Sequence, residues 1–393
     1  MKFQPHKTSK NLKLLEFDYQ ASTPCALEVC TAMEPYWSDF WGNPSSRENR
    51  SGLRAAAAVD LARERIASYL GVEPQRFVFT SGATESNNLA LLGVARAQAN
   101  IRGKPGHIIT SNIEHHAVLD PLRQLVNEGF RLTELVPDSD GLLKIDQFIE
   151  AIEPDTILVS VMLANNEIGV IQPLQEIAKL CKDRGIKIHT DAAQAFGYIP
   201  FDINTFGVDL ISISGHKIYG PKGIGGLAIR SDIPLVPLQW GGGQQEALRP
   251  GTIPVPLTIG FAKAAEIAIR DLSTNQVNYK FLRDSLWEGL KDNIPDLIIN
   301  GTLKNRLPHN LNITIKGVKG SKLYSRLKSR VLCSSGSACA QGKPSHVLRA
   351  IGRTKFEAES SIRFSLGRST SLEDVRNLIS VLESIVRDLR KSS

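Results

Sequence analysis

Short apolar runs alternate with amphipathic stretches between about residues 60 and 260, and this alternation is the strongest constraint on the fold. Such a pattern predicts strands and helices that follow one another around a mostly parallel central sheet flanked by helices. The fold class is therefore α/β. The expected strands are residues 76–80, 107–110, 157–162, 186–190, 209–213 and 226–229, and the expected helices are 85–98, 117–127 and 173–183.

The chain length predicts two packed units. With 393 residues, of which 42% are hydrophobic, the chain exceeds what one simple core usually holds. Residues 257–293 have the pattern of one or two long helices that lead to a smaller α+β domain with strands at 310–315 and 361–365. The expected division is an N-terminal arm, 1–17, packed on the small domain, a large domain, 18–271, and a small C-terminal domain, 272–393.

Charge and cysteine content narrow the function classes. The formal net charge is +7, yet acids stand among the Lys and Arg residues, so direct nucleic-acid binding is not expected. No stretch of 18 apolar residues is present, so no membrane partner is expected. Five irregularly spaced cysteines favour a reducing compartment, which we take to be the cytoplasm, and no metal site is predicted. Four of these cysteines are expected to be buried packing residues: Cys25, Cys30, Cys181 and Cys333.

The run Ser214-Gly215-His216-Lys217 follows an expected strand and precedes a glycine-rich stretch, 219–226. A lysine presented there in a buried pocket would be desolvated, which disfavours its charged form and makes it a nucleophile or a base. A Schiff-base lysine needs this environment. The segment taken alone fits a surface turn equally well.

Two further motifs suit pyridoxal phosphate. The stretch 80–88 turns a strand into a helix whose free N–H groups, with the Ser81 and Thr84 hydroxyls, could hold a phosphate. Asp191 follows the strand 186–190 and could pair with the cofactor's pyridine nitrogen, while Gln194 could hold its ring oxygen. Helix capping by Thr84 or Ser86, and by Asp191, is the plain alternative in each case.

His115 and Asn166 complete the set. The His115 ring could stack on the cofactor and relay protons, and the Asn166 amide could donate to the ring oxygen. A capping or surface histidine and an asparagine turn are the alternatives. All these residues lie where ligands collect in an α/β sheet, beyond the carboxyl ends of the strands, so together they predict a pyridoxal-phosphate site.

Nine segments, in order, resemble cysteine desulfurases of the class V aminotransferase group. The similarity extends over roughly residues 17–390, and the loop Ser334-Ser335-Gly336-Ser337-Ala338-Cys339 is similar to that of the housekeeping iron–sulfur branch. This resemblance implies the fold of the fold-type I transferases that depend on pyridoxal phosphate. The segments are 18–24, 42–46, 80–88, 114–115, 165–169, 191–194, 214–217, 249–254 and 334–339.

The resemblance also implies a reaction and its residues. L-Cysteine would give L-alanine and a persulfide on Cys339, which lies in a loop expected to be mobile and exposed; Lys217 would take the Cα proton and His115 would act as acid or base. The sulfur would pass to an iron–sulfur scaffold protein or to another acceptor, and it would serve iron–sulfur cluster assembly and tRNA thiolation. The implied cofactor contacts are Ala83, Thr84, His115, Asn166, Asp191, Gln194, Ser214, His216, Lys217 and Thr252, and the implied substrate contacts are Asn43, Asn166 and Arg363. Thr252 would act across the interface of a homodimer.

Some positions depart from the family pattern. No histidine follows shortly after residues 43–46, none stands between Met162 and Asn165, and the flank 340–343 differs from the usual sequence. Two other functions therefore stay open at this stage. One is a related lyase acting on selenocysteine or cystine, in which Cys339 would be dispensable. The other is a scaffold that binds cluster-assembly partners.

Overall fold

The computed structural model describes residues 14–335 and 344–391, and its centre is a sheet of seven strands within these residues. The spatial order of the strands is β2-β8-β7-β6-β5-β3-β4. Their bounds are β2 Phe77–Thr80, β3 His107–Ser111, β4 Arg131–Leu135, β5 Thr156–Ser160, β6 Lys187–Asp191, β7 Leu210–Ser214 and β8 Gly225–Ile229. The expected α/β class is confirmed.

The sheet is mostly parallel, as predicted. Strands β7, β6, β5, β3 and β4 run parallel to their neighbours, whereas β8 is antiparallel to both β7 and β2. Only residues 215–224 separate β7 from β8, and this is too short for the helical crossover that a parallel pair requires. The short connection therefore reverses the chain, and its turn carries Lys217.

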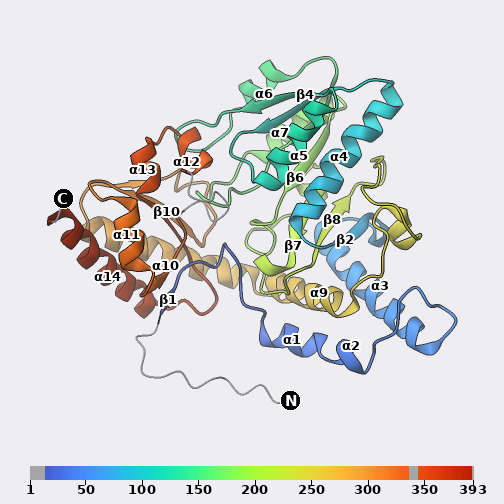
Figure 1. The fold of residues 1–393 in the computed structure, drawn as a ribbon, viewed down its shortest axis with the longest axis horizontal. Helices are drawn as coiled ribbons and strands as arrows, with labels where there is room; N and C mark the ends of the chain where they lie inside the picture. Colours follow the sequence, from blue (N-terminus) through green and yellow to red (C-terminus); the bar gives the residue numbers. More distant parts are fainter. Residues whose placement is uncertain (1–13, 336–343, 392–393) are drawn as a thin grey trace.

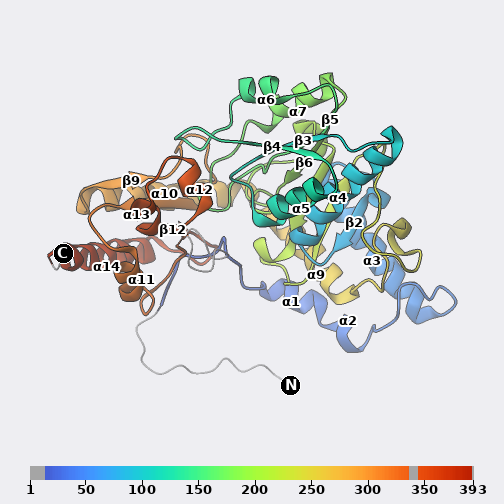
Figure 2. The same cartoon turned by 45° about the horizontal axis from the view of Figure 1, so that its top comes forward.

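Both faces of the sheet are buried, because successive side chains of a strand point to opposite faces. Ile108 and Leu158 pack in the core beneath α4 and α5, while the adjacent Ile109 and Val159 belong to the main core on the other face. Figure 2 shows α4 and α5 together over one side of the sheet. The helices of this unit are α1 Leu27–Met33, α2 Pro35–Ser38, α3 Arg50–Leu70, α4 Ala83–Arg102, α5 His116–Asn127, α6 Ile145–Ala151, α7 Leu174–Asp183, α8 Ile203–Phe206 and α9 Val255–Arg270.

A smaller α+β unit lies beside the large one, at the left of Figure 1. Its sheet is antiparallel, with β10 between β12 and β9, and α14 packs on α10 and α11. The N-terminal strand β1 (Leu15–Glu16) pairs with β11, so this end of the chain lies against the small unit. The elements are α10 Leu272–Asn293, β9 Leu297–Ile299, β10 Asn310–Ile315, α11 Gly320–Leu327, β11 Val331–Leu332, α12 His346–Ala350, α13 Lys355–Glu359, β12 Ser361–Ser365 and α14 Leu372–Lys391.

The helices α9 and α10 run one after the other from the large unit to the small one (Figure 1). The expected pair of helices over residues 257–293 is thus found, with Asp271 between them. The two domain boundaries stay predictions. The second, after residue 271, falls where the structure changes element, since α9 ends at Arg270 and α10 begins at Leu272.

One strand was not predicted, and one cysteine lies where it was not expected. The missed strand is β4, an edge strand whose charged residues Arg131 and Glu134 are at least partly exposed and interrupt the apolar pattern. Cys30 was expected to be buried, yet it is exposed on α1, and Cys25 and Cys333 are only partly buried. Cys181 is buried, as expected.

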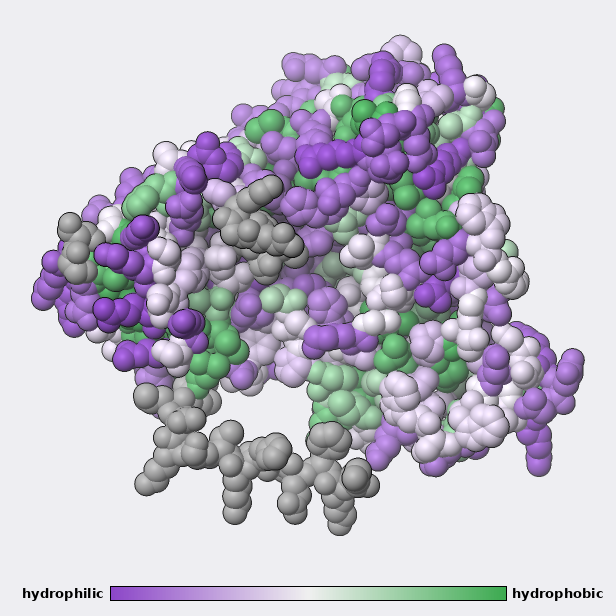
Figure 3. All heavy atoms as spheres, viewed as in Figure 1, coloured by the Kyte–Doolittle hydropathy of each residue, from purple (hydrophilic) through white to green (hydrophobic). Residues whose placement is uncertain are grey.

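Polar and apolar residues are interspersed on the surface. Hydrophilic side chains cover much of the face seen in Figure 3, and apolar residues form separate small areas among them. None of the helices in the described ranges is both long and apolar enough to cross a membrane.

Candidate active site

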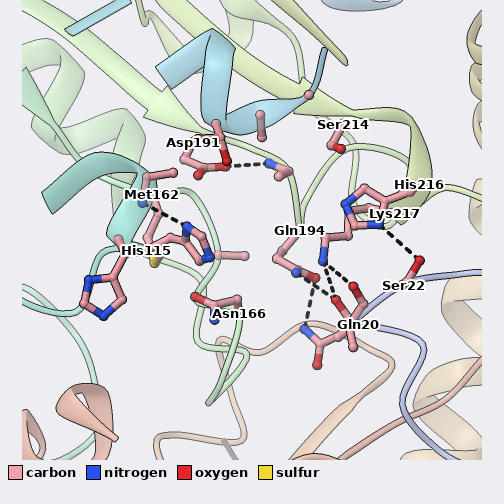
Figure 4. A pocket seen from close by; sticks show the side chains of 18 of the residues that line it. Gln20, Ser22, His115, Met162, Asn166, Asp191, Gln194, Ser214, His216 and Lys217 are labelled. Carbon is pink, nitrogen blue, oxygen red and sulfur yellow. Dashed lines mark hydrogen bonds between the residues drawn. The ribbon is translucent and has the colours of Figure 1, made fainter. Parts of the chain in front are cut away.

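A cavity of about 640 Å³ opens at the carboxyl ends of β5, β6 and β7. It brings together segments that lie far apart in the chain, from Gln20 to Arg363. Figure 4 shows several of them, from Gln20 to Lys217. Every implied cofactor contact except Thr252 lines it, and so does the substrate contact Arg363. These lining residues are Ala83, Thr84, His115, Asn166, Asp191, Gln194, Ser214, His216, Lys217 and Arg363.

Lys217 lies in the short 3-10 turn Gly215–Lys217 directly after β7, and its side chain enters the cavity. Its Nζ donates to the carbonyl oxygens of Gln20 at 2.7 Å and Ala21 at 2.9 Å. A Cβ on Gly215 would lie 2.9 Å from the Ile224 side chain, so only glycine allows this close turn. Lys217 is therefore a pocket lysine, and the alternative of a surface turn is excluded.

Asp191 is the last residue of β6, and its carboxylate is held by two donors. The Asn87 side chain donates to Oδ2 at 2.8 Å, and the Ala193 N–H donates to Oδ1 at 2.9 Å. No helix starts at Asp191, so it does not cap one. Gln194, the residue after Ala193, exchanges hydrogen bonds with Gln20 beside the lysine. A fixed carboxylate facing a cavity suits a cationic ring nitrogen.

The N-terminus of α4 also opens into the cavity. Its N-cap is Gly82, which offers no side-chain acceptor to the helix, and the Ser86 hydroxyl bonds to Thr80 instead. The capping roles considered for Thr84 and Ser86 are thus excluded. A Cβ added at Gly82 would meet nothing within 4 Å, so there is open space at this helix end. Free N–H groups beside open space form a site for a phosphate.

His115 is the N-cap of α5, and its Nδ1 accepts from the Ala117 N–H at 3.0 Å. The capping alternative is correct here, and the ring lines the cavity as well (Figure 4). Burial lowers the pKa of His115. Burial also lowers the pKa of His216 to about 4, and the neighbouring Lys217 contributes to that shift. Both rings are therefore neutral near pH 7.

The two asparagines that follow β5, Asn165 and Asn166, have different roles. The Asn165 Oδ1 accepts from the N–H groups of Glu167 and Ile168 and so forms the turn. Asn166 is left to face the cavity, and its buried Oδ1 has no partner among the described residues. A buried polar atom without a partner costs free energy, so this amide indicates a ligand group.

Arg363 on β12 is buried rather than directed to solvent, with a side chain that is 5% exposed. Its Nη1 donates to the Asn166 carbonyl oxygen at 2.7 Å, and its Nη2 donates to Asp18 Oδ1 at 2.7 Å. Within the described residues its Nε has no acceptor. This guanidinium belongs to a residue that lines the cavity, and it retains a donor without a partner among the described residues.

The residues present fit pyridoxal phosphate. Asn166 has an unpartnered amide, the N-terminus of α4 opens on free space at Gly82, and Asp191 and Lys217 are held at the same cavity. An α/β sheet with such a site at the carboxyl ends of its strands defines a pyridoxal-phosphate enzyme of fold type I.

Comparison with known proteins gives the family. The family described as Aminotransferase class-V matches residues 16–378. A mitochondrial cysteine desulfurase of Drosophila melanogaster is 47% identical, over 92% of this chain and 78% of that protein. The chain belongs to the cysteine desulfurases of the class-V aminotransferase family.

Two solved structures agree with this assignment. A NifS-like protein is 35% identical with a TM-score of 0.88, covering 96% of this chain and 100% of that one. A structure described as SspA in complex with cysteine is 38% identical with a TM-score of 0.78, covering 89% of this chain and 98% of that one. The resemblance read from the sequence is confirmed.

Two implied site residues of the described chain, Asn43 and Thr252, do not line the cavity. Both are exposed and lie elsewhere on the surface. Cys339 lies outside the described residues. Several side chains that build or line the site were assigned no role from the sequence, although three of them stand within the segments that carry the resemblance: Gln20, Asn87 and Glu167, together with Met162 and His346.

Proposed function

We propose that this protein removes the sulfur atom of L-cysteine, giving L-alanine and a persulfide on Cys339. The observation that carries the proposal is the convergence of the Lys217 amine, the Asp191 carboxylate and the open N-terminus of α4 on one cavity. The family supports cysteine as the substrate. One structural relative is described as a complex with cysteine.

Pyridoxal phosphate would be held from three sides. Asp191, fixed by Asn87, would face the ring nitrogen, and the α4 N-terminus with Ser214 and His216 would hold the phosphate. The remaining contacts, from His115, Asn166 and Gln194, would meet the ring and its oxygen. The bound cofactor would supply an electron-withdrawing ring that stabilises negative charge on the substrate Cα.

Two residues would bind and activate the substrate. Arg363 would hold its carboxylate, since this residue lines the cavity, its Nε has no partner among the described residues, and a planar guanidinium suits a carboxylate. The Lys217 amine, positioned by the carbonyl oxygens of Gln20 and Ala21, would take the Cα proton.

The transfer of sulfur from the substrate to Cys339 needs no other oxidant or reductant. The Cys339 thiolate attacks the substrate sulfur, so an S–S bond forms and the Cβ–S bond breaks. The electron pair of the broken bond stays with the substrate carbon, which then takes a proton and leaves as alanine. A thiolate is the reactive form for such an attack.

The partners and the compartment are also proposals. Exposed Thr252 is available to reach the site of a second copy, which supports a homodimer. An iron–sulfur scaffold protein or a tRNA-thiolating protein would accept the sulfur. The cytoplasm stays the predicted compartment, although the Drosophila relative is named as mitochondrial.

The test measures alanine released from L-cysteine by the purified protein with pyridoxal phosphate and a thiol reductant. We expect stoichiometric alanine and sulfide, and loss of both in Cys339→Ala. Cys30→Ala is the matched control, because Cys30 is exposed on α1 and does not line the cavity. Undiminished turnover by Cys339→Ala would contradict the proposal and favour a lyase that needs no protein thiol.

A further inference from the structure

The small unit is strongly basic. Residues 272–393 hold 21 of the 47 Lys and Arg residues but only 10 of the 40 acidic residues, so their formal charge is +11, and that of residues 1–271 is −4. Residues 316–330, called the basic segment below, contain six cations and no acid. The intermixing of charges expected from the sequence therefore does not extend to this segment. Its cations are Lys316, Lys319, Lys322, Arg326, Lys328 and Arg330.

All six cations of the basic segment are exposed. Among the described residues, the salt bridges of the small unit use other cations. The helix α11 turns Leu323 and Leu327 inward and packs on α14, and both helices lie at the left of Figure 1. Lys322 and Arg326 are four residues apart, so they share the exposed face, and like charges at this spacing repel. An anionic partner would remove that repulsion.

A seventh cation extends the surface. Arg390, near the end of α14, donates from Nη2 to the carbonyl oxygens of Lys316 at 2.7 Å and Pro295 at 2.8 Å. These oxygens carry no net charge, so they hold the guanidinium in place without neutralising it. The positive surface therefore continues from the basic segment onto α14.

The basic segment ends beside the cavity. The strand β11 follows it directly, and Ser334 then exchanges two main-chain hydrogen bonds with Arg363, at 2.8 and 3.2 Å. Four residues of extended chain span at most about 14 Å, so Arg330 lies close to this residue of the cavity wall. A partner bound to the basic segment would therefore lie next to the cavity.

The surroundings favour a protein over a nucleic acid as that partner. Leu332 is 44% exposed beside the cations, and apolar residues bordered by polar ones are typical of protein interfaces. The single aromatic residue of the segment, Tyr324, is only partly exposed and donates its hydroxyl to the Ser361 carbonyl oxygen. It therefore offers no open ring for base stacking. Glu357 on the neighbouring α13 would also repel a nucleic acid that extends past the segment.

We propose that the basic segment is a docking surface for the acidic face of a protein partner. The proposal rests on the proposed function in one respect, because a partner beside this cavity is taken to be the acceptor of the sulfur. Attraction between opposite charges speeds encounter and orients the partner at the cavity. The segment itself takes no part in the chemistry.

The first test measures binding of a fluorescent peptide of ten glutamates to the holoenzyme at about 0.05 M salt, where charges are screened little. The patch variant neutralises three cations of the segment, and the control variant neutralises three exposed cations of the large unit. We expect binding about tenfold weaker in the patch variant and within about twofold of the wild type in the control. The substitutions are Lys319→Gln, Lys322→Gln and Arg326→Gln in the patch variant and Lys179→Gln, Lys182→Gln and Arg184→Gln in the control.

Two results of this test would overturn the proposal. One is equal binding of the glutamate peptide by the wild type and the patch variant, including no binding by either. The other is tighter binding of a ten-nucleotide polyuridylate than of the peptide, lost in the patch variant, which would make the partner a nucleic acid.

The second test measures sulfur transfer from the holoenzyme, supplied with L-cysteine, to a peptide with one cysteine between five glutamates on each side. The peptide thiolate attacks the outer sulfur of the Cys339 persulfide, so a new S–S bond forms, the old one breaks and the Cys339 thiolate leaves. We expect transfer about tenfold slower in the patch variant than in the wild type, and equal rates in both for a peptide with serines in place of the glutamates.

The two proposals fail in different ways. If the wild type forms no alanine from cysteine, the proposed function is contradicted, and the docking surface is decided by the binding test alone. If the wild type forms alanine and the patch variant passes sulfur to the glutamate peptide at an undiminished rate, only the docking surface is overturned.

Discussion

Replacing Arg363 by lysine tests how the site recognises its substrate. Arg363 is buried and lines the cavity, two of its nitrogens are engaged by Asn166 and Asp18, and Nε has no partner among the described residues. Lysine keeps the positive charge but has a single nitrogen, so it cannot reproduce this set of bonds. Hydrogen bonds to a charged group contribute about 1.5–3 kcal/mol. At about 1.4 kcal/mol per tenfold, kcat/KM for L-cysteine should fall by about 10- to 150-fold.

The assay is initial-rate alanine formation at several cysteine concentrations, with the visible absorbance of the bound cofactor as a check on loading. Asp18→Asn is the matched control, because it changes the partner of Arg363 and leaves the guanidinium in place. We expect a much smaller loss in this control. A kcat/KM of Arg363→Lys within threefold of the wild type, with normal cofactor loading, would refute the assignment of Arg363 to the substrate carboxylate.

Three further substitutions test the site and its support. Asp191→Asn should weaken pyridoxal-phosphate binding by about 10- to 150-fold in an absorbance titration; unchanged affinity would contradict its role. Asn165→Ala loses three hydrogen bonds to backbone groups and should lower the urea-unfolding free energy by about 3 kcal/mol; a loss under 1 kcal/mol would contradict this role. Burial lowers the pKa of His309 to about 3, so only the unfolded chain gains its proton below about pH 6.5. From pH 7.5 to 5 the wild type should therefore lose about 2 kcal/mol more than His309→Phe, and equal losses would contradict this.

Much of the site could be predicted because its residues follow strands. Asp191 ends β6 and Lys217 follows β7, and the carboxyl ends of neighbouring parallel strands lie at one edge of the sheet. Chain order and apolar runs therefore placed both at the same cavity. The same reasoning located β10 and β12, whose observed bounds, Asn310–Ile315 and Ser361–Ser365, match the expected ones.

The rest depends on contacts that no local pattern records. Gln20 contacts Lys217 from nearly two hundred positions away in the chain, and the role of Asn87 depends on a single hydrogen bond to Asp191. A polar residue inside an apolar helix, such as Asn87 in α4, looks like any other buried amide until its partner is known. Cys30 was misjudged because a short helix gives too few positions to tell its buried face from its exposed one.

The central claim is that sulfur leaves cysteine by way of a persulfide on Cys339. The most direct measurement is the mass of the peptide containing Cys339 after the holoenzyme meets L-cysteine without reductant. We predict a gain of one sulfur atom on that peptide, removed by reductant and matched by one equivalent of alanine. Alanine release with no added sulfur on Cys339, or added sulfur on Cys30 in its place, would contradict this account.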